Sequence, residues 1–243
     1  MTGNAAERFT AFDTSHQVAL LLLVAGAFAL VWVGRATRQG DPGDRIGKGL
    51  AVAVLLLTLP LQVIYFTPDY WDLYTTLPLQ LCDVAAWVSA YALWTHRAWA
   101  VGLTYYWGLT LATQAIITPD LASTFPDLVF ILFWGMHLMI VWAAVYLTWG
   151  LGLTPSWRSY RIALCATAAW AVTIYAFNVT VGTNYGYLNA KPQTASILDL
   201  LGDWPWYVLA EISLVIAVWA LATWPWVSPA RRRGRASDVQ HRS

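Results

Sequence analysis

Seven long apolar segments lie within the 243 residues of this chain, and they constrain its fold more than any other feature. Each approaches the roughly 20 residues that a helix needs to cross the hydrocarbon core of a bilayer. Unpaired backbone amides are too costly in lipid for irregular structure, so we predict that the segments are helices. The expected spans are residues 16–33, 48–66, 77–94, 99–117, 126–149, 161–180 and 205–226.

The composition agrees with a membrane protein. Hydrophobic residues make up 58% of the chain and charged residues only 11%, whereas soluble domains carry about 25% charged residues. We therefore predict an all-α membrane protein, with a single bundle of seven transmembrane helices over residues 1–226 and a basic cytoplasmic tail over 227–243. No small-residue cleavage site follows the first apolar segment, so we expect that segment to be retained as a helix.

The distribution of positive charge predicts the orientation. All but two of the 14 Lys and Arg residues fall on one side of the expected bundle, and the exceptions are Arg8 and Lys191. The positive-inside rule then places the N-terminus outside and the C-terminus in the cytoplasm, which requires an odd number of crossings. Seven crossings satisfy this requirement, and we expect a multi-pass protein of the plasma membrane.

The longest expected connection, residues 181–204, lies on the outer side. Its stretch from Gly182 to Pro192 is rich in Tyr, Asn and Gly, and it is too aromatic for a slack linker. We expect this loop to fold back over the bundle as a lid or a re-entrant plug. An ordinary loop at the membrane interface is the alternative.

Polar side chains within the spans gather in the outer half of the expected bundle. Polar groups in a membrane are costly and are functional candidates by default, so this pattern predicts one cavity that opens outward. Hydrogen bonding between helices is the alternative role for the amides, and solvation at the interface is the alternative for the two carboxylates. The residues concerned are Gln62, Gln80, Cys82, Asp83, Gln114, His137, Asn178 and Glu211.

Cys82 and His137 carry the most reactive groups of this set. Cys82 is expected near the start of its helix, with Pro78 in the first turn, where the helix dipole favours a thiolate. His137 is the only histidine deep in a span, and a cysteine beside a histidine base is suited to acyl transfer. Their expected depths differ by roughly 7–8 Å. From the residues alone, a packing cysteine and a hydrogen-bonded histidine are the preferred interpretation.

Several stretches resemble the YwaF-like integral membrane proteins, a family with a eukaryotic branch implicated in acyl transfer onto lysophospholipids. The resemblance covers residues 9–226 and is strongest in the run from Leu77 to Cys82 and in the long connection 181–204 with the run from Trp204 to Tyr207 that follows it. It implies that Cys82 is the nucleophile and His137 the base. The family pattern often has a histidine where this chain has Gln80, which places any acid–base role of that position in doubt.

These observations lead to two functional hypotheses. The first is a fatty-acyl transferase of glycerophospholipids and lysophospholipids that works through a cysteine thioester. The second is a non-enzymatic protein that binds or transports a lipid or small molecule. The expected partners are phospholipids, lysophospholipids and the bilayer, and we expect no nucleic acid and no cofactor. We expect no metal either, because a metal site would need a second deep histidine beside His137. The expected substrate-binding residues are Gln80, Asn178, Asn184, Tyr185, Lys191 and Glu211. Residues 205–226 contain no lysine, which excludes a retinal Schiff base.

Overall fold

The computed structural model describes residues 9–192 and 197–228, and the described part is helical, with no strand. Five of its helices are long and apolar enough to cross a membrane. They are α1 (Thr14–Thr37), α2 (Asp41–Tyr65), α6 (Leu128–Val145) with its π-helical continuation η2 (Tyr146–Gly150), α7 (Trp157–Val181) and α8 (Trp206–Val227). The expected basic tail lies almost wholly outside the described residues.

Two further helical passes complete the bundle. The first is α3 (Leu81–Thr95), whose 15 residues measure about 22 Å at 1.5 Å per residue, shorter than a hydrocarbon core of about 30 Å. The second pass consists of three consecutive helical pieces. That these two passes cross the membrane stays a prediction. The three pieces are α4 (Ala98–Trp107), the π-helical η1 (Gly108–Ala112) and α5 (Thr113–Ile117).

The start of α3 differs from the expectation. We expected helix from residue 77 with Pro78 in its first turn, and this is wrong, because α3 begins at Leu81. The amide of Leu77 binds the hydroxyl of Tyr185 at 3.0 Å, and the amide of Leu79 binds the carbonyl of Leu77 at 2.7 Å in a tight turn. These contacts keep residues 77–80 outside the helix.

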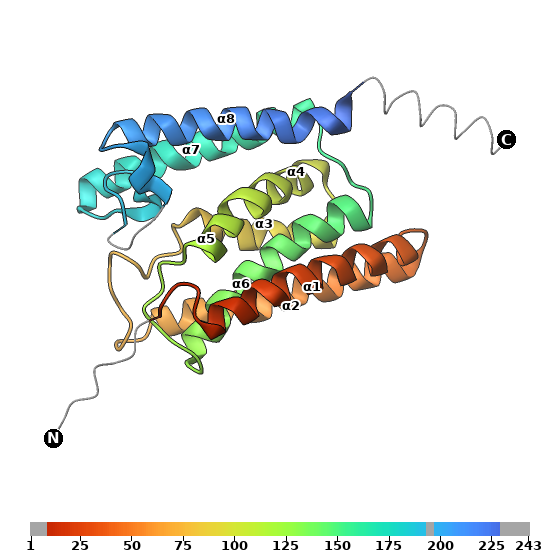
Figure 1. Cartoon of the computed structure of the whole chain (residues 1–243), viewed down its shortest axis with the longest axis horizontal. Coiled ribbons are helices and arrows are strands. Elements are labelled where there is room, and N and C mark those ends of the chain that lie inside the picture. Colours follow the sequence, from red (N-terminus) through yellow and green to blue (C-terminus); the bar gives the residue numbers. More distant parts are fainter. Residues whose placement is uncertain (1–8, 193–196, 229–243) are drawn as a thin grey trace.

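The helices form three layers when viewed as in Figure 1. α1 and α2 lie along one side, α3 to α6 form the middle, and α7 and α8 form a hairpin along the other side. α6 is the most buried of the five long helices, and it packs against α1, α2 and α3. The α7–α8 hairpin is much more exposed and contacts the middle layer mainly through α4 and its π-helical extension.

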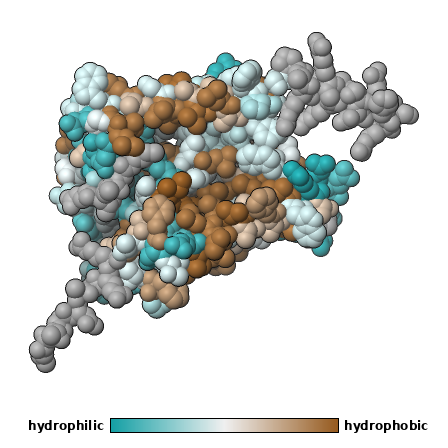
Figure 2. Space-filling model, in the orientation of Figure 1, coloured by the Kyte–Doolittle hydropathy of each residue, from teal (hydrophilic) through white to brown (hydrophobic). Residues whose placement is uncertain are grey.

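The outer helices present large apolar side chains to the surroundings. Phe28 and Trp32 on α1 are each 74% exposed, and Val172 on α7 is 71% exposed. Figure 2 shows the corresponding band of hydrophobic surface between more hydrophilic ends. Exposed apolar surface of this extent marks a membrane or protein contact, and here it lies on helices of spanning length. We conclude that this is a multi-pass membrane protein whose helices contact the lipid bilayer.

The two ends of the bundle are built from different connections. The first, here called the Cys82 end, comprises residues 66–80, 118–127 and 182–205, and these connections are long. The second, here called the basic end, comprises residues 38–40, 96–97 and 151–156, which are short. The two sets lie at opposite ends of the long helices in Figure 1.

Candidate functional site

Cys82 is the second residue of α3, directly after the N-cap residue Gln80 and Leu81. The backbone of Gln80 is extended, and its amide donates to the carboxylate of Asp83 at 3.1 Å, which closes the first turn. The thiol is free and half-buried. The predicted position of Cys82 in a first helical turn is therefore confirmed.

The loop after α7 folds back onto the chain that leads into Cys82. The amide of Gly186 donates to the side-chain oxygen of Gln80 at 2.9 Å. The indole of Trp170 donates to the carbonyl of Leu79 at 3.0 Å, and the same ring covers Gly186 so closely that a Cβ there would lie 2.3 Å from it. Gly186 also has a φ of 68°, which favours glycine. These contacts fix the loop to the residues that precede α3, so the loop folds back over the bundle as expected.

Asn178 organises the same loop from the end of α7. Its amide nitrogen donates to the carbonyl of Tyr185 at 2.9 Å and to the side chain of Asn189 at 3.0 Å. Its oxygen accepts from the hydroxyl of Thr183 and from the amide of Tyr185, both at 2.9 Å. Since Asn178 is only 1% exposed, its polar atoms are fully engaged in shaping the loop.

Tyr185 connects this loop to the α2–α3 connection. Its buried ring lies beneath the loop, and its hydroxyl donates to the carbonyl of Leu73 at 2.7 Å while accepting from the amide of Leu77. Asn184 binds the amides of Asn189 and Ala190 and the carbonyl of Ala190. The predicted binding residues Tyr185 and Asn184 thus hold loop backbone in this state of the protein.

Tyr187 lies between this loop and two other elements of the Cys82 end. Its hydroxyl donates to the carboxylate of Asp120 at 2.6 Å, and its carbonyl accepts from the hydroxyl of Tyr207 at the start of α8. Burial and the neighbouring Asp120 raise the pKa of Tyr187, and the charge of a Cys82 thiolate acts in the same direction. These two hydrogen bonds link the loop after α7 to the connection 118–127 and to α8.

Lys191 and Glu211 lie at the α8 side of the site. The ammonium of Lys191 is 3.7 Å from Asp203 and 3.9 Å from Asp199, and 6.0 Å from the centre of the Tyr207 ring. Glu211 is half-buried one turn after Tyr207 and acts electrostatically on it. The positive charge of Lys191 is therefore already balanced by the carboxylates of Asp199 and Asp203.

His137 lies apart from these contacts. It is the tenth residue of α6 and only 3% exposed. Its Nδ1 is 2.8 Å from the carbonyl of Phe133 one turn earlier, and the ring centroids of the two residues are 4.2 Å apart. Because a carbonyl can only accept, Nδ1 carries the proton and Nε2 keeps a lone pair. Within the described residues, no hydrogen bond joins His137 to Cys82.

The structure also shows site residues that sequence reasoning missed. Trp170 lies in the middle of α7, and from the sequence alone a tryptophan there is interpreted as a lipid-facing or core residue. Gly186, Tyr187 and Tyr207 were part of aromatic runs whose pairing could not be deduced. Asp120 belonged to a separate connection. The signal that could have found Gly186 is its place between two tyrosines, since a glycine within an aromatic loop often marks a close approach or a positive φ.

The fold and this site define a polytopic helical membrane protein in which a folded loop is docked at the start of a cysteine-bearing helix. The sequence matches the profile of the TMEM164 family over residues 11–223. The chain therefore belongs to the TMEM164 family. This match gives no evidence for the resemblance to the YwaF-like proteins, which stays an interpretation. No curated protein and no solved structure gives a significant match.

Proposed function

We propose that this protein is a fatty-acyl transferase of the plasma membrane that acts on glycerophospholipids and lysophospholipids through Cys82. The observation that carries the proposal is the position of the thiol, which is free and half-buried in the first turn of α3 next to a docked loop. A cysteine that served only for packing would not require the hydrogen bonds that fix Leu79 and Gln80 directly before its helix. The resemblance to YwaF-like proteins suggests the same chemistry.

In the first half-reaction the Cys82 sulfur attacks the ester carbonyl of a phospholipid. A carbon–sulfur bond forms, the ester carbon–oxygen bond breaks, and the lysophospholipid leaves with the proton that the thiol has lost. In the second half-reaction the hydroxyl of another lysophospholipid attacks the thioester carbon, the carbon–sulfur bond breaks, and the proton that the hydroxyl loses returns to the sulfur and restores the thiol. Atoms and charge balance without a cofactor. An outward orientation of the Cys82 end favours a phospholipid donor over cytoplasmic acyl-CoA.

His137 is the proposed carrier of the proton in both half-reactions. The hydrogen bond of Nδ1 to Phe133 leaves Nε2 free to accept a proton. Counted from the starts of their helices, the two side chains differ in depth by about 12 Å at 1.5 Å per residue. A substrate or a water chain must therefore bridge them, which makes the role of His137 separable from that of Cys82 by experiment.

The test is acyl exchange between a labelled phospholipid and a lysophospholipid in reconstituted membranes. Cys82→Ala is expected to abolish exchange, and His137→Ala to lower it by about 10²–10⁴-fold, the usual contribution of a general base. Cys165→Ala is the matched control, because Cys165 is free, exposed and remote in sequence from the loop. Unchanged exchange in Cys82→Ala contradicts the proposal.

A lipid-binding protein without catalysis is the second candidate, and one observation favours it. An apolar groove of about 290 Å³ lies between α7 and α8, lined by Ala171, Val172, Tyr175, Leu188, Trp204 and Val208 among others. Leu188 and Trp204 belong to the loop that docks near Cys82, so a bound lipid chain would contact both. Lipid binding that persists in Cys82→Ala, with no acyl exchange in the unmodified protein, would select this candidate.

A further inference from the structure

The apolar groove of about 290 Å³ at the α7–α8 hairpin has one wall that belongs to a loop. The loop closes the end of the hairpin in Figure 1. The groove volume lies near the lower end of the roughly 300–1,000 Å³ that ligand sites occupy, so there is room for part of a lipid chain. The walls come from α7 (Ala171, Val172 and Tyr175), from the loop (Leu188 and Trp204) and from the start of α8 (Val208).

The surroundings of the groove identify its occupant. Val172 on its rim is 71% exposed, and both helices are long and apolar enough to span a membrane. Of the described residues that line the groove, none is charged, and the indole of Trp204 already donates to the carbonyl of Leu188 at 3.3 Å. The groove is thus continuous with the surface that contacts the bilayer, and an acyl chain is the ligand of matching chemistry. Lipid tails are as apolar as the groove, so binding depends on packing, for which the rings of Tyr175 and Trp204 offer a large area.

The loop residue in the groove is held by the residues on both sides of it. Tyr187, directly before Leu188, donates through its hydroxyl to the carboxylate of Asp120 at 2.6 Å. Asn189, directly after Leu188, accepts through its side chain from Asn178 at 3.0 Å. Leu188 therefore forms a wall of the groove only while the loop is docked.

The same loop and helix also hold the entry to α3. Gly186, two residues before the groove residue of the loop, donates to the side chain of Gln80 at 2.9 Å. Trp170, directly before the groove residue Ala171 on α7, donates to the carbonyl of Leu79 at 3.0 Å. Neighbouring residues on each element thus face the groove and the start of the cysteine-bearing helix, which makes the two sites share one docked loop.

We propose that a phospholipid acyl chain binds in this groove and holds the loop docked at the start of α3. A ligand favours the state that it binds more tightly, and the groove loses the walls of Leu188 and Trp204 when the loop leaves. A chain in the groove therefore shifts the loop towards the docked state and controls access to Cys82. This control rests on the proposed function, because it regulates the same site, whereas the coupling of lipid to loop needs no catalysis.

The test measures hydrogen exchange of the loop in the full-length protein while lipid is added. The protein is placed in micelles of a steroid detergent, which has no acyl chain, and dioleoylphosphatidylcholine is titrated in. The amides of residues 185–190 should exchange about tenfold more slowly when the lipid reaches about ten times its Kd, because the open loop is depleted by the factor 1 + [L]/Kd. Glycerophosphocholine, which has the headgroup without a chain, should have no effect. Exchange that does not respond to the lipid, or that responds equally to glycerophosphocholine, overturns the proposal.

Variants that fill the groove decide whether it is responsible. Ala171→Phe occupies the groove from α7 and Val208→Trp occupies it from α8, so in both the loop should no longer respond to lipid. Val179→Phe is the matched control, because Val179 is 60% exposed on α7 but does not line the groove, and this variant should respond like the unmodified protein. A full response in both filled variants, or an equal loss in Val179→Phe, would overturn the proposal.

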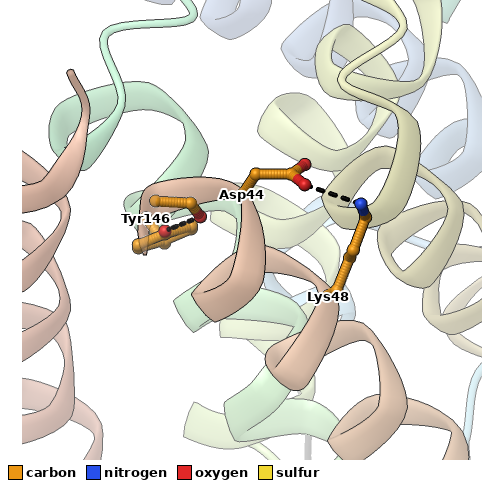
Figure 3. Close-up of polar contacts among 4 residues, drawn as sticks. Asp44, Lys48 and Tyr146 are labelled. Carbon is orange, nitrogen blue, oxygen red and sulfur yellow. Dashed lines mark hydrogen bonds and ion pairs between the residues drawn. The ribbon is translucent and has the colours of Figure 1, made fainter. Parts of the chain in front are cut away.

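The basic end of the bundle is the internal control. There the hydroxyl of Tyr146 donates to the carbonyl of Gly43 at 2.8 Å, and Lys48 holds the carboxylate of Asp44 at 2.6 Å (Figure 3). None of these residues lines the groove, so exchange of residues 41–48 should not change with the lipid. Equal slowing at the two ends would mean that lipid stabilises the whole bundle, and it would overturn the proposal.

The outcome is separable from that of acyl transfer. Cys82 does not line the groove, so Cys82→Ala should keep the response of the loop to lipid. A response of the loop in a protein without acyl exchange would support this inference and contradict the proposed function. Acyl exchange without any response of the loop would do the reverse.

Discussion

At the Cys82 end, side chains reach across to backbone groups of distant loops, whereas at the basic end the backbones of neighbouring helices touch. Gln80 and Trp170 each contribute one hydrogen bond to the loop contacts at the first end, and Asn178 contributes four. Gly34 and Gly150 hold the second through a contact that admits no side chain. A net hydrogen bond is worth about 1 kcal/mol, whereas the glycine contact leaves no room for a side chain, so we expect the first end to open more readily than the second. This difference is what the proposed acyl-transfer site would require, because a lipid substrate must reach the Cys82 thiol.

The largest expected effect tests the close helix packing at the basic end. Gly34→Leu forces a side chain into the backbone of Gly150 and is predicted to destabilise the whole bundle by about 3 kcal/mol. Unfolding in mixed micelles, followed by tryptophan fluorescence, measures this. Gly49→Leu is the control, because nothing lies within 4 Å of a Cβ at Gly49, and a gain in helix propensity of up to about 1 kcal/mol is expected there. Equal behaviour of the two variants would remove the distinction between the ends.

A smaller and local effect is expected at the Cys82 end. Gly186→Ala places a Cβ on the Trp170 ring and at a positive φ, whereas Gly182→Ala meets the same backbone strain in open space. The strain costs about 1–2 kcal/mol in both, and the collision adds to it only in Gly186→Ala. Hydrogen exchange of residues 183–189 should rise most in Gly186→Ala, with the global unfolding free energy nearly unchanged. Loss of global stability would contradict a loop that opens by itself.

The smallest effect is a pH dependence of the loop. The pKa of Tyr187 is raised by burial and by Asp120, so the folded loop favours the neutral phenol. Its contribution is complete below the ordinary tyrosine pKa of about 10 and is lost as the pH rises through the folded value. Spectroscopic titration of tyrosinate should show one late-titrating group fewer in Tyr187→Phe than in the wild-type protein. A wild-type titration identical to that of Tyr187→Phe would exclude this role.

Sequence patterns predicted the helical passes but not how their ends are arranged. Apolar length alone identifies α1, α2, α6, α7 and α8, because burial of twenty apolar residues in lipid depends on no distant partner. The start of α3 could not be predicted, since Tyr185 from a remote loop withdraws the amide of Leu77 from the helix.

In the candidate site, too, some residues could be predicted from the local sequence and others could not. Cys82 and Asn178 were found because polar groups are conspicuous in an apolar segment. Trp170 was missed because a tryptophan in a span reads equally as a lipid contact, and only its bond to Leu79 reveals its role. A cavity between residues 38–44, His96 and residues 151–153 was missed as well, since its lining comes from parts of the chain that are distant in sequence. Long-range pairing of loops is the information that periodicity and composition do not carry.

The central claim is that Cys82 carries an acyl group during turnover. The most direct measurement incubates the reconstituted protein with a phospholipid that has an isotopically labelled acyl chain, quenches it in acid, and maps the label by peptide mass spectrometry with and without hydroxylamine. The account predicts a hydroxylamine-labile acyl group on the peptide that contains Cys82 and none on the peptide that contains Cys165. Acyl exchange that proceeds without any label on Cys82, or equal labelling of both cysteines, would contradict it.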